Sequence, residues 1–115
     1  MATFYARQND NKVNIEATLL NADKTPIDLS EIDRVEFHVG KEGETSVESR
    51  IIDVVATVVG DPTEGNVKYT LTSDDLAAEP ATYDAEFEIF WPDGTDHTVP
   101  TKAGQFKFVI GRVVK

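Results

Sequence analysis

Histidines and carboxylates are the residues of this 115-residue chain that could support metal or acid–base chemistry. The only histidines, His38 and His97, lie far apart in the sequence, and Glu36 stands two residues before His38. One histidine beside carboxylates can bind a metal ion, but a pair of histidines close in sequence is the stronger signal. Because that pair is absent, we interpret His38 as a solvent-facing strand residue and predict no metal site.

Aspartate pairs are the second candidate for chemistry. Asp74 and Asp75 are adjacent and could act as paired carboxylates, and Asp23 with Asp28 could suggest a calcium loop. The D-x-D-x-D-G pattern with its terminal glutamate is missing, however. Helix capping and loop solvation therefore explain these aspartates better than a functional site does.

Nucleophiles and phosphate-binding loops have no recognisable setting in this sequence. There is no cysteine, no G-x-S-x-G motif and no glycine-rich loop, because the glycines stand singly at turns. The lack of cysteine also excludes a disulfide framework. The sequence therefore predicts a protein that is not an enzyme and needs no cofactor.

The charge balance is strongly acidic, with 21 acidic against 11 basic residues and a net charge of −10. Such a surface disfavours nucleic acid and anionic membranes, whereas high solubility, a basic partner or a saline habitat would each fit it. No apolar run is long enough to span a membrane, and Met1-Ala2-Thr3-Phe4 begins no signal peptide. We therefore expect synthesis and folding in a cytoplasm.

The longest alternating stretch is Thr82 to Trp91, which reads T-Y-D-A-E-F-E-I-F-W. Side chains of a strand point alternately to opposite faces, so this segment has one apolar and one acidic face. The acidic row, Asp84, Glu86 and Glu88, has two interpretations. It could face outward lysines on flanking strands, for which Lys68 and Lys107 are candidates, or it could be a docking face for a basic partner.

Shorter alternating segments surround this strand and are separated by turn signals. Pro92-Asp93-Gly94 predicts a hairpin, and Ser73 is a plausible N-cap for one helical turn. The pattern favours an all-β fold, an immunoglobulin-like antiparallel β-sandwich of seven to eight short strands in one domain, 1–115, with at most one helical turn near 73–77. The expected strands cover residues 3–7, 12–20, 34–39, 51–59, 67–71, 82–91, 96–99 and 105–114.

Tyr83 sharpens the sandwich prediction. Immunoglobulin-like folds often carry a tyrosine near the start of the sixth strand, and its hydroxyl bonds back to the preceding corner. The one-turn helix and Pro80-Ala81-Thr82 precede Tyr83 in that arrangement. The alternative is an ordinary core aromatic.

Several apolar residues point outward if the alternation holds, notably Phe90, Val55, Val59 and Val109. Exposed apolar groups on a small domain suggest a protein interface, although a local bulge or twist could bury them. The candidate protein-contact positions are Phe4, Phe90, Trp91, Val109 and Val114.

Three ordered stretches resemble the N-terminal domain of the phage baseplate upper protein family. They are A-T-L-L-N-A-D-K-T-P-I-D-L (17–29) followed by V-E-F-H-V (35–39), then G-N-V-K-Y-T-L-T-S-D-D (65–75), and A-T-Y-D-A-E-F-E-I-F-W-P-D-G-T (81–95) followed by T-V-P (98–100) and F-K-F-V-I (106–110). Lys24 and Ala81 stand where the family often has glycine, which affects the local turns.

The resemblance implies a non-enzymatic structural protein of a tailed virus, on the baseplate, tail or head of a bacteriophage virion. Its partners would be other virion proteins, in several symmetric copies, after synthesis in the host cytoplasm. The alternative is a carbohydrate-binding or adhesion module, in which Trp91 with Tyr5 or Phe90 would stack on sugar rings.

Overall fold

The computed structural model describes residues 2–21, 23–43, 50–99 and 106–111. Within these residues the chain forms strands and two short 3₁₀ turns, and no helix long and apolar enough to cross a membrane. The strands are β1 (Ala2–Arg7), β2 (Val13–Thr18), β3 (Arg34–Lys41), β4 (Arg50–Val58), β5 (Asn66–Leu71), β6 (Ala81–Phe90), β7 (Asp96–Val99) and β8 (Phe106–Gly111), and the 3₁₀ turns are η2 (Pro62–Glu64) and η3 (Asp75–Ala77).

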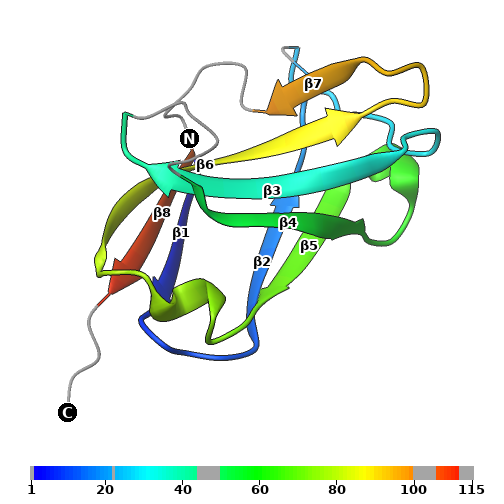
Figure 1. Cartoon of the computed structure of the whole chain (residues 1–115). Helices are drawn as coiled ribbons and strands as arrows, with labels where there is room; N and C mark the ends of the chain where they lie inside the picture. The colour runs from blue at the N-terminus through cyan, green and yellow to red at the C-terminus, as the bar shows by residue number, and fades with distance from the viewer. Residues whose placement is uncertain (1, 22, 44–49, 100–105, 112–115) are drawn as a thin grey trace.

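β6 is the central strand, as its alternation predicted. The whole length of β3 pairs antiparallel with β6. On the opposite edge of β6, β8 pairs with the start of the strand and β7 with its end. The strand order is β1-β8-β6-β3-β4-β5-β2, with β7 beside β6 (Figure 1). Register therefore gives each half of β6 different neighbours on one side.

The pairing of β1 with β8 is parallel, so the prediction of a purely antiparallel fold is wrong at this edge. Parallel neighbours need a long connection, and these two strands lie at opposite ends of the chain. Tyr5 stands opposite Val109, and Phe4 opposite Phe108.

The sheet bends through β4, which pairs with β3 along most of its length and with β5 only at Thr57 and Val58. β2 and β5 consequently pass behind β3 and β4 (Figure 1). The result is a nearly closed, barrel-like sheet, so the structure confirms the all-β class while the immunoglobulin-like sandwich stays a prediction.

The apolar core lies between these two parts of the sheet and contains the apolar face predicted for residues 82–91. Phe37, Phe87 and Phe108 are almost fully buried, and the Phe37 and Phe87 rings lie 4.9 Å apart. Val35, Tyr83 and Ile89 belong to the same cluster, and Phe106 packs half-buried against it. Full burial of one such aromatic side chain contributes about 1.5–3 kcal/mol relative to leaving it exposed.

The corner before β6 is held by the predicted tyrosine bond. The Tyr83 hydroxyl donates a hydrogen bond of 2.5 Å to the Glu79 carbonyl.

The predicted Ser73 cap is wrong: Thr72 Oγ1 accepts from the Asp75 amide, and an Asp75 carboxylate oxygen accepts from the Thr72 amide. This reciprocal pair satisfies backbone donors at the start of η3 as a capping box does.

Gly65 closes the turn between β4 and β5. Its φ is 72°, and an added Cβ would lie 2.7 Å from the Leu19 carbonyl oxygen. Glycine adopts this left-handed backbone conformation at the least cost, and only glycine leaves room for that close approach. The turn between β4 and β5 therefore depends on this position.

Candidate functional site

Phe90 and Trp91, two predicted contact residues, lie where β6 ends. The Arg34 guanidinium stacks over the Phe90 ring, 3.8 Å from its centroid. Trp91 is half-buried and packs against the core. A cation over one ring face covers apolar area that would otherwise face solvent. Less of the Phe90 ring is therefore available for a protein contact than the alternation predicted.

Phe4 and Val109 lie at the β1–β8 edge. Phe4 is half-buried, and its ring packs edge-on against Phe37 and Phe106. Val109 is half-buried beside Tyr5, which is 71% exposed, and both line an open hollow with Val13. Val114, the fifth candidate, lies outside the described residues.

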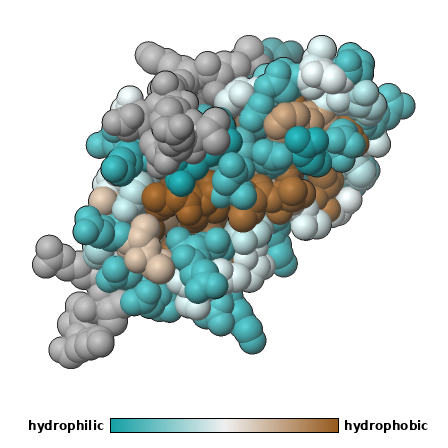
Figure 2. Space-filling view, viewed as in Figure 1, coloured by the Kyte–Doolittle hydropathy of each residue, from teal (hydrophilic) through white to brown (hydrophobic). Residues whose placement is uncertain are grey.

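A hydrophobic stripe follows β4 across the face shown in Figure 2. Val55 is 58% exposed, and Ile51, Val54, Val58 and Val59 are half-buried. Such a strand has more apolar surface than one core face can cover. This stripe is the feature that best fits a protein contact among the described residues.

The aromatics proposed for sugar stacking do not form one platform. Tyr5 is aligned through Val109 with Thr82 at the start of β6, whereas Phe90 ends that strand. At about 3.3 Å per residue, the two positions are roughly 26 Å apart. Arg34 covers the Phe90 ring, and Trp91 packs half-buried against the core, so the pair Phe90 and Trp91 offers no open platform either. The structure therefore gives the carbohydrate-binding alternative no support.

The acidic row is compensated at its first residue, Asp84, by Lys107, one of the two lysines predicted for this role. Lys107 lies opposite Asp84, and its Nζ donates a 2.6 Å hydrogen bond to that carboxylate. Partial burial raises the pKa of Asp84, but the bonds from Lys107 and the Gly43 amide outweigh it and lower the pKa overall. The prediction for Lys68 is wrong, because β5 pairs with β2 and β4, and Lys68 stands opposite Glu16.

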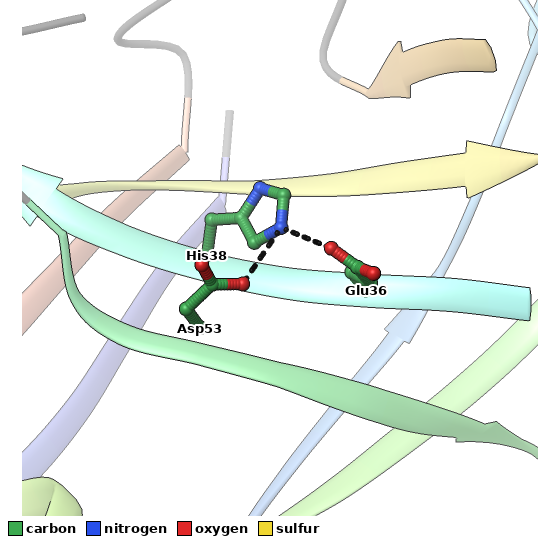
Figure 3. A group of neighbouring side chains, drawn as sticks. All are labelled: Glu36, His38 and Asp53. Atoms are coloured by element: carbon green, nitrogen blue, oxygen red, sulfur yellow. Dashed lines mark hydrogen bonds and ion pairs between the residues drawn. The ribbon is translucent and has the colours of Figure 1, made fainter. Parts of the chain in front are cut away.

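The other two residues of the acidic row, Glu86 and Glu88, lie beside His38, which is only 2% exposed. His38 occupies the predicted outer face of β3, but the prediction that it faces solvent is wrong. Its Nε2 lies 2.9 Å from Glu36 and 3.3 Å from Asp53 (Figure 3). Its Nδ1 lies 3.4 Å from Glu86 and 3.8 Å from Glu88. Carboxylates on three neighbouring strands thus cover both edges of one imidazole.

The charges of this cluster shift one another's pKa values. Burial lowers the pKa of His38, but hydrogen bonds to Glu86 and Glu36 outweigh it, so the pKa lies above its ordinary value of 6.5. The bond to His38 lowers the pKa of Glu86. Burial raises the pKa of Glu36, yet bonds from Arg34 and His38 lower it overall, whereas burial and contact with Asp96 raise the pKa of Glu88.

The donor set of this cluster has the composition of a metal site, since Glu36, His38 and Asp53 hold ligand-type atoms within 4.8 Å of one another. Arg34 already binds Glu36 at 2.7 Å, and Arg50 lies 3.3 Å from Asp53. The carboxylates of Glu36 and Asp53 are therefore already paired with a guanidinium group and with the imidazole. The arrangement therefore favours a proton over a metal ion as its central positive charge.

Asp23 and Asp28, the residues considered for calcium, make local turns instead. Each carboxylate accepts hydrogen bonds from the amide and hydroxyl two residues later, in Thr25 and Ser30 respectively. Asp61 and Asp93 repeat this pattern. Side chains of this kind mimic a backbone turn, which explains part of the acidic excess.

Comparison with known proteins decides the family. The family model described as the BppU N-terminal domain matches residues 2–112. The chain belongs to that family. No curated protein matches the sequence.

Membership of the BppU N-terminal domain family implies a structural component of the phage baseplate, because BppU denotes the baseplate upper protein. The resemblance drawn from three sequence stretches is confirmed over nearly the whole chain. The family also implies a virion location and other virion proteins as partners.

Proposed function

We propose that this BppU N-terminal domain is a non-enzymatic structural protein that acts through protein–protein contacts in a symmetric phage assembly. The observation that carries the proposal is the family match over residues 2–112. Baseplates repeat their subunits, and repetition multiplies individually weak contacts into a stable assembly. Chemistry is not needed for such a role.

The exposed apolar groups support contact with other virion proteins. The stripe on β4, centred on Val55, and the hollow beside Tyr5 and Val109 each combine apolar side chains with a polar surround. Phe4, Phe90 and Trp91 would add contacts at the two ends of β6, with Val114 near the chain end. In this proposal residues 1–115 form one immunoglobulin-like domain.

The acidic surface supports protein partners over nucleic acid or membranes. A net charge of −10 repels phosphate backbones and anionic lipid surfaces alike. The partners would be several symmetric copies of other virion proteins, met after synthesis in the host cytoplasm.

Mass spectrometry of purified phage particles tests the proposal. We expect the chain in the particle at a constant stoichiometry of several copies. A chain absent from extensively purified particles, yet abundant in the lysate, would overturn the structural role.

Incorporation of surface variants tests the contact surface. Val55→Glu should reduce the amount of the chain in assembled particles, because it places a charge in the β4 stripe. Thr70→Glu is the matched control, since Thr70 is an exposed residue of β5 that lies outside the stripe. Normal incorporation of Val55→Glu would exclude the stripe as the contact.

A further inference from the structure

The group of charges around His38 has a geometry that the baseplate assignment does not explain. His38 is 2% exposed although it lies on the outer face of the sheet, away from the aromatic core. Strand register puts it opposite Asp53 on β4 and opposite Glu86 on β6. One imidazole thus joins three strands through side chains, in addition to their backbone pairing.

Both ring nitrogens face carboxylates, and this decides the protonation state. A neutral imidazole has one N–H donor and one lone pair. With the proton on Nδ1, the lone pair of Nε2 would face Glu36 at 2.9 Å; with the proton on Nε2, the lone pair of Nδ1 would face Glu86 at 3.4 Å. Each neutral form sets a lone pair against a negative acceptor, whereas the imidazolium donates on both sides.

We propose that His38 is a doubly protonated cation that clamps β3, β4 and β6 together, and that loss of one of its protons as the pH rises loosens this face of the domain. We call Glu36, His38, Asp53, Glu86 and Glu88 the His38 clamp. The clamp stands independently of the baseplate assignment.

The surrounding charges support a cation at the centre. Acidic groups outnumber basic ones, and Arg34 and Arg50 bind only the Glu36 and Asp53 side. Without the imidazolium, no cationic side chain among the described residues lies within 4.0 Å of Glu86 or Glu88. The charged groups facing His38 are Arg34 and Glu36 on β3, Arg50 and Asp53 on β4, Glu86 and Glu88 on β6, and Asp96 of β7 through Glu88.

The direction of the pH dependence follows from linkage. The folded-state pKa of His38 is raised above 6.5. The clamp therefore stabilises the fold fully below pH 6.5, and this stabilisation disappears as the pH rises through the folded pKa.

Nitrogen NMR of the histidine rings tests the protonation state directly in the folded chain. We expect both His38 nitrogens to carry protons at pH 6.5, with a titration midpoint above that value. His97→Gln assigns the signals by removing the other histidine. A neutral, single-tautomer His38 at pH 6.5 would overturn the proposal.

Carboxylate variants test whether the neighbours cause the effect. Glu86→Gln should lower the His38 midpoint, while Glu16→Gln, the same change on β2, should leave it unchanged. An unchanged midpoint in Glu86→Gln would contradict the clamp.

Addition of zinc to EDTA-treated protein is the last test. Stoichiometric loss of the His38 titration would show that a metal ion, not a proton, occupies the site, and would also overturn the proposal.

Discussion

Phe37 and His38 are neighbours on β3 and are both buried, but by opposite physical means. Phe37 is 0% exposed on the inner face and contacts other aromatic rings. His38 is 2% exposed on the outer face and is covered by charged side chains. A buried residue of a sheet therefore need not belong to its hydrophobic core.

The two faces should respond differently to solution conditions. Burial of apolar area is non-directional and has no ionisable group, so its contribution is insensitive to pH. The clamp depends on one proton and on partly exposed carboxylates, so its contribution depends on both pH and salt. Variants on the two faces can separate these effects.

Phe37→Ala should have the largest effect, because it removes the ring that contacts Phe4, Phe87 and Phe108. Truncation of a buried phenylalanine costs about 3–5 kcal/mol. Urea unfolding should show this loss at mildly acidic and at alkaline pH alike. A loss that changes strongly with pH would mean that the inner face also depends on the charges above it.

His38→Leu should have the next largest effect, because it leaves the clamp carboxylates without their cation. We expect a loss of about 1–3 kcal/mol below pH 6.5, at the lower end if water screens the exposed carboxylates. The difference from wild type should shrink as the pH rises through the His38 pKa, because wild type loses its own cation there.

Urea midpoints of both proteins across this pH range measure the difference. His97→Gln controls for the removal of a histidine from another strand, β7. A constant gap between wild type and His38→Leu at every pH would indicate a packing role for the ring, without the charge.

Tyr83→Phe should have a moderate effect at the corner before β6. It removes one hydroxyl that donates to the Glu79 carbonyl and keeps the buried ring. Loss of such a bond costs about 0.5–1.5 kcal/mol. Calorimetric unfolding should detect it, with Tyr5→Phe as a matched control, because Tyr5 is 71% exposed. Equal stability of both variants would show that the corner bond contributes nothing.

Local sequence patterns predicted the inner face well. Alternation identified the apolar face of β6, and the segment before Tyr83 predicted its corner bond. Each of these two signals comes from residues that lie close together in the sequence. The hairpin after β6 is similar, since Pro92-Asp93-Gly94 gives a turn in which Gly94 has a φ of 89°.

The outer face could not be predicted because its contacts depend on strand order and register. His38 and Glu86 are 48 residues apart, and alternation places both outward without telling which strands are neighbours. The same ambiguity made Lys68 and Lys107 equal candidates for the acidic row. Only Lys107 lies on a strand beside β6.

Lys107→Met should have the smallest effect and completes the contrast within the acidic row. Lys107 bridges Asp84 at 2.6 Å and Glu42 at 2.9 Å, but its side chain is 26% exposed, so water and salt screen this cation more than they screen the enclosed His38. We expect a smaller shift in the urea midpoint than for Tyr83→Phe, and a shift that disappears in high salt. Lys12→Met is the control, because Lys12 is exposed in the turn before β2. A loss of stability as large as that of His38→Leu, persisting in high salt, would show that exposure does not distinguish the Asp84–Lys107 pair from the His38 clamp. Register alone would then set the strength of each charge pair.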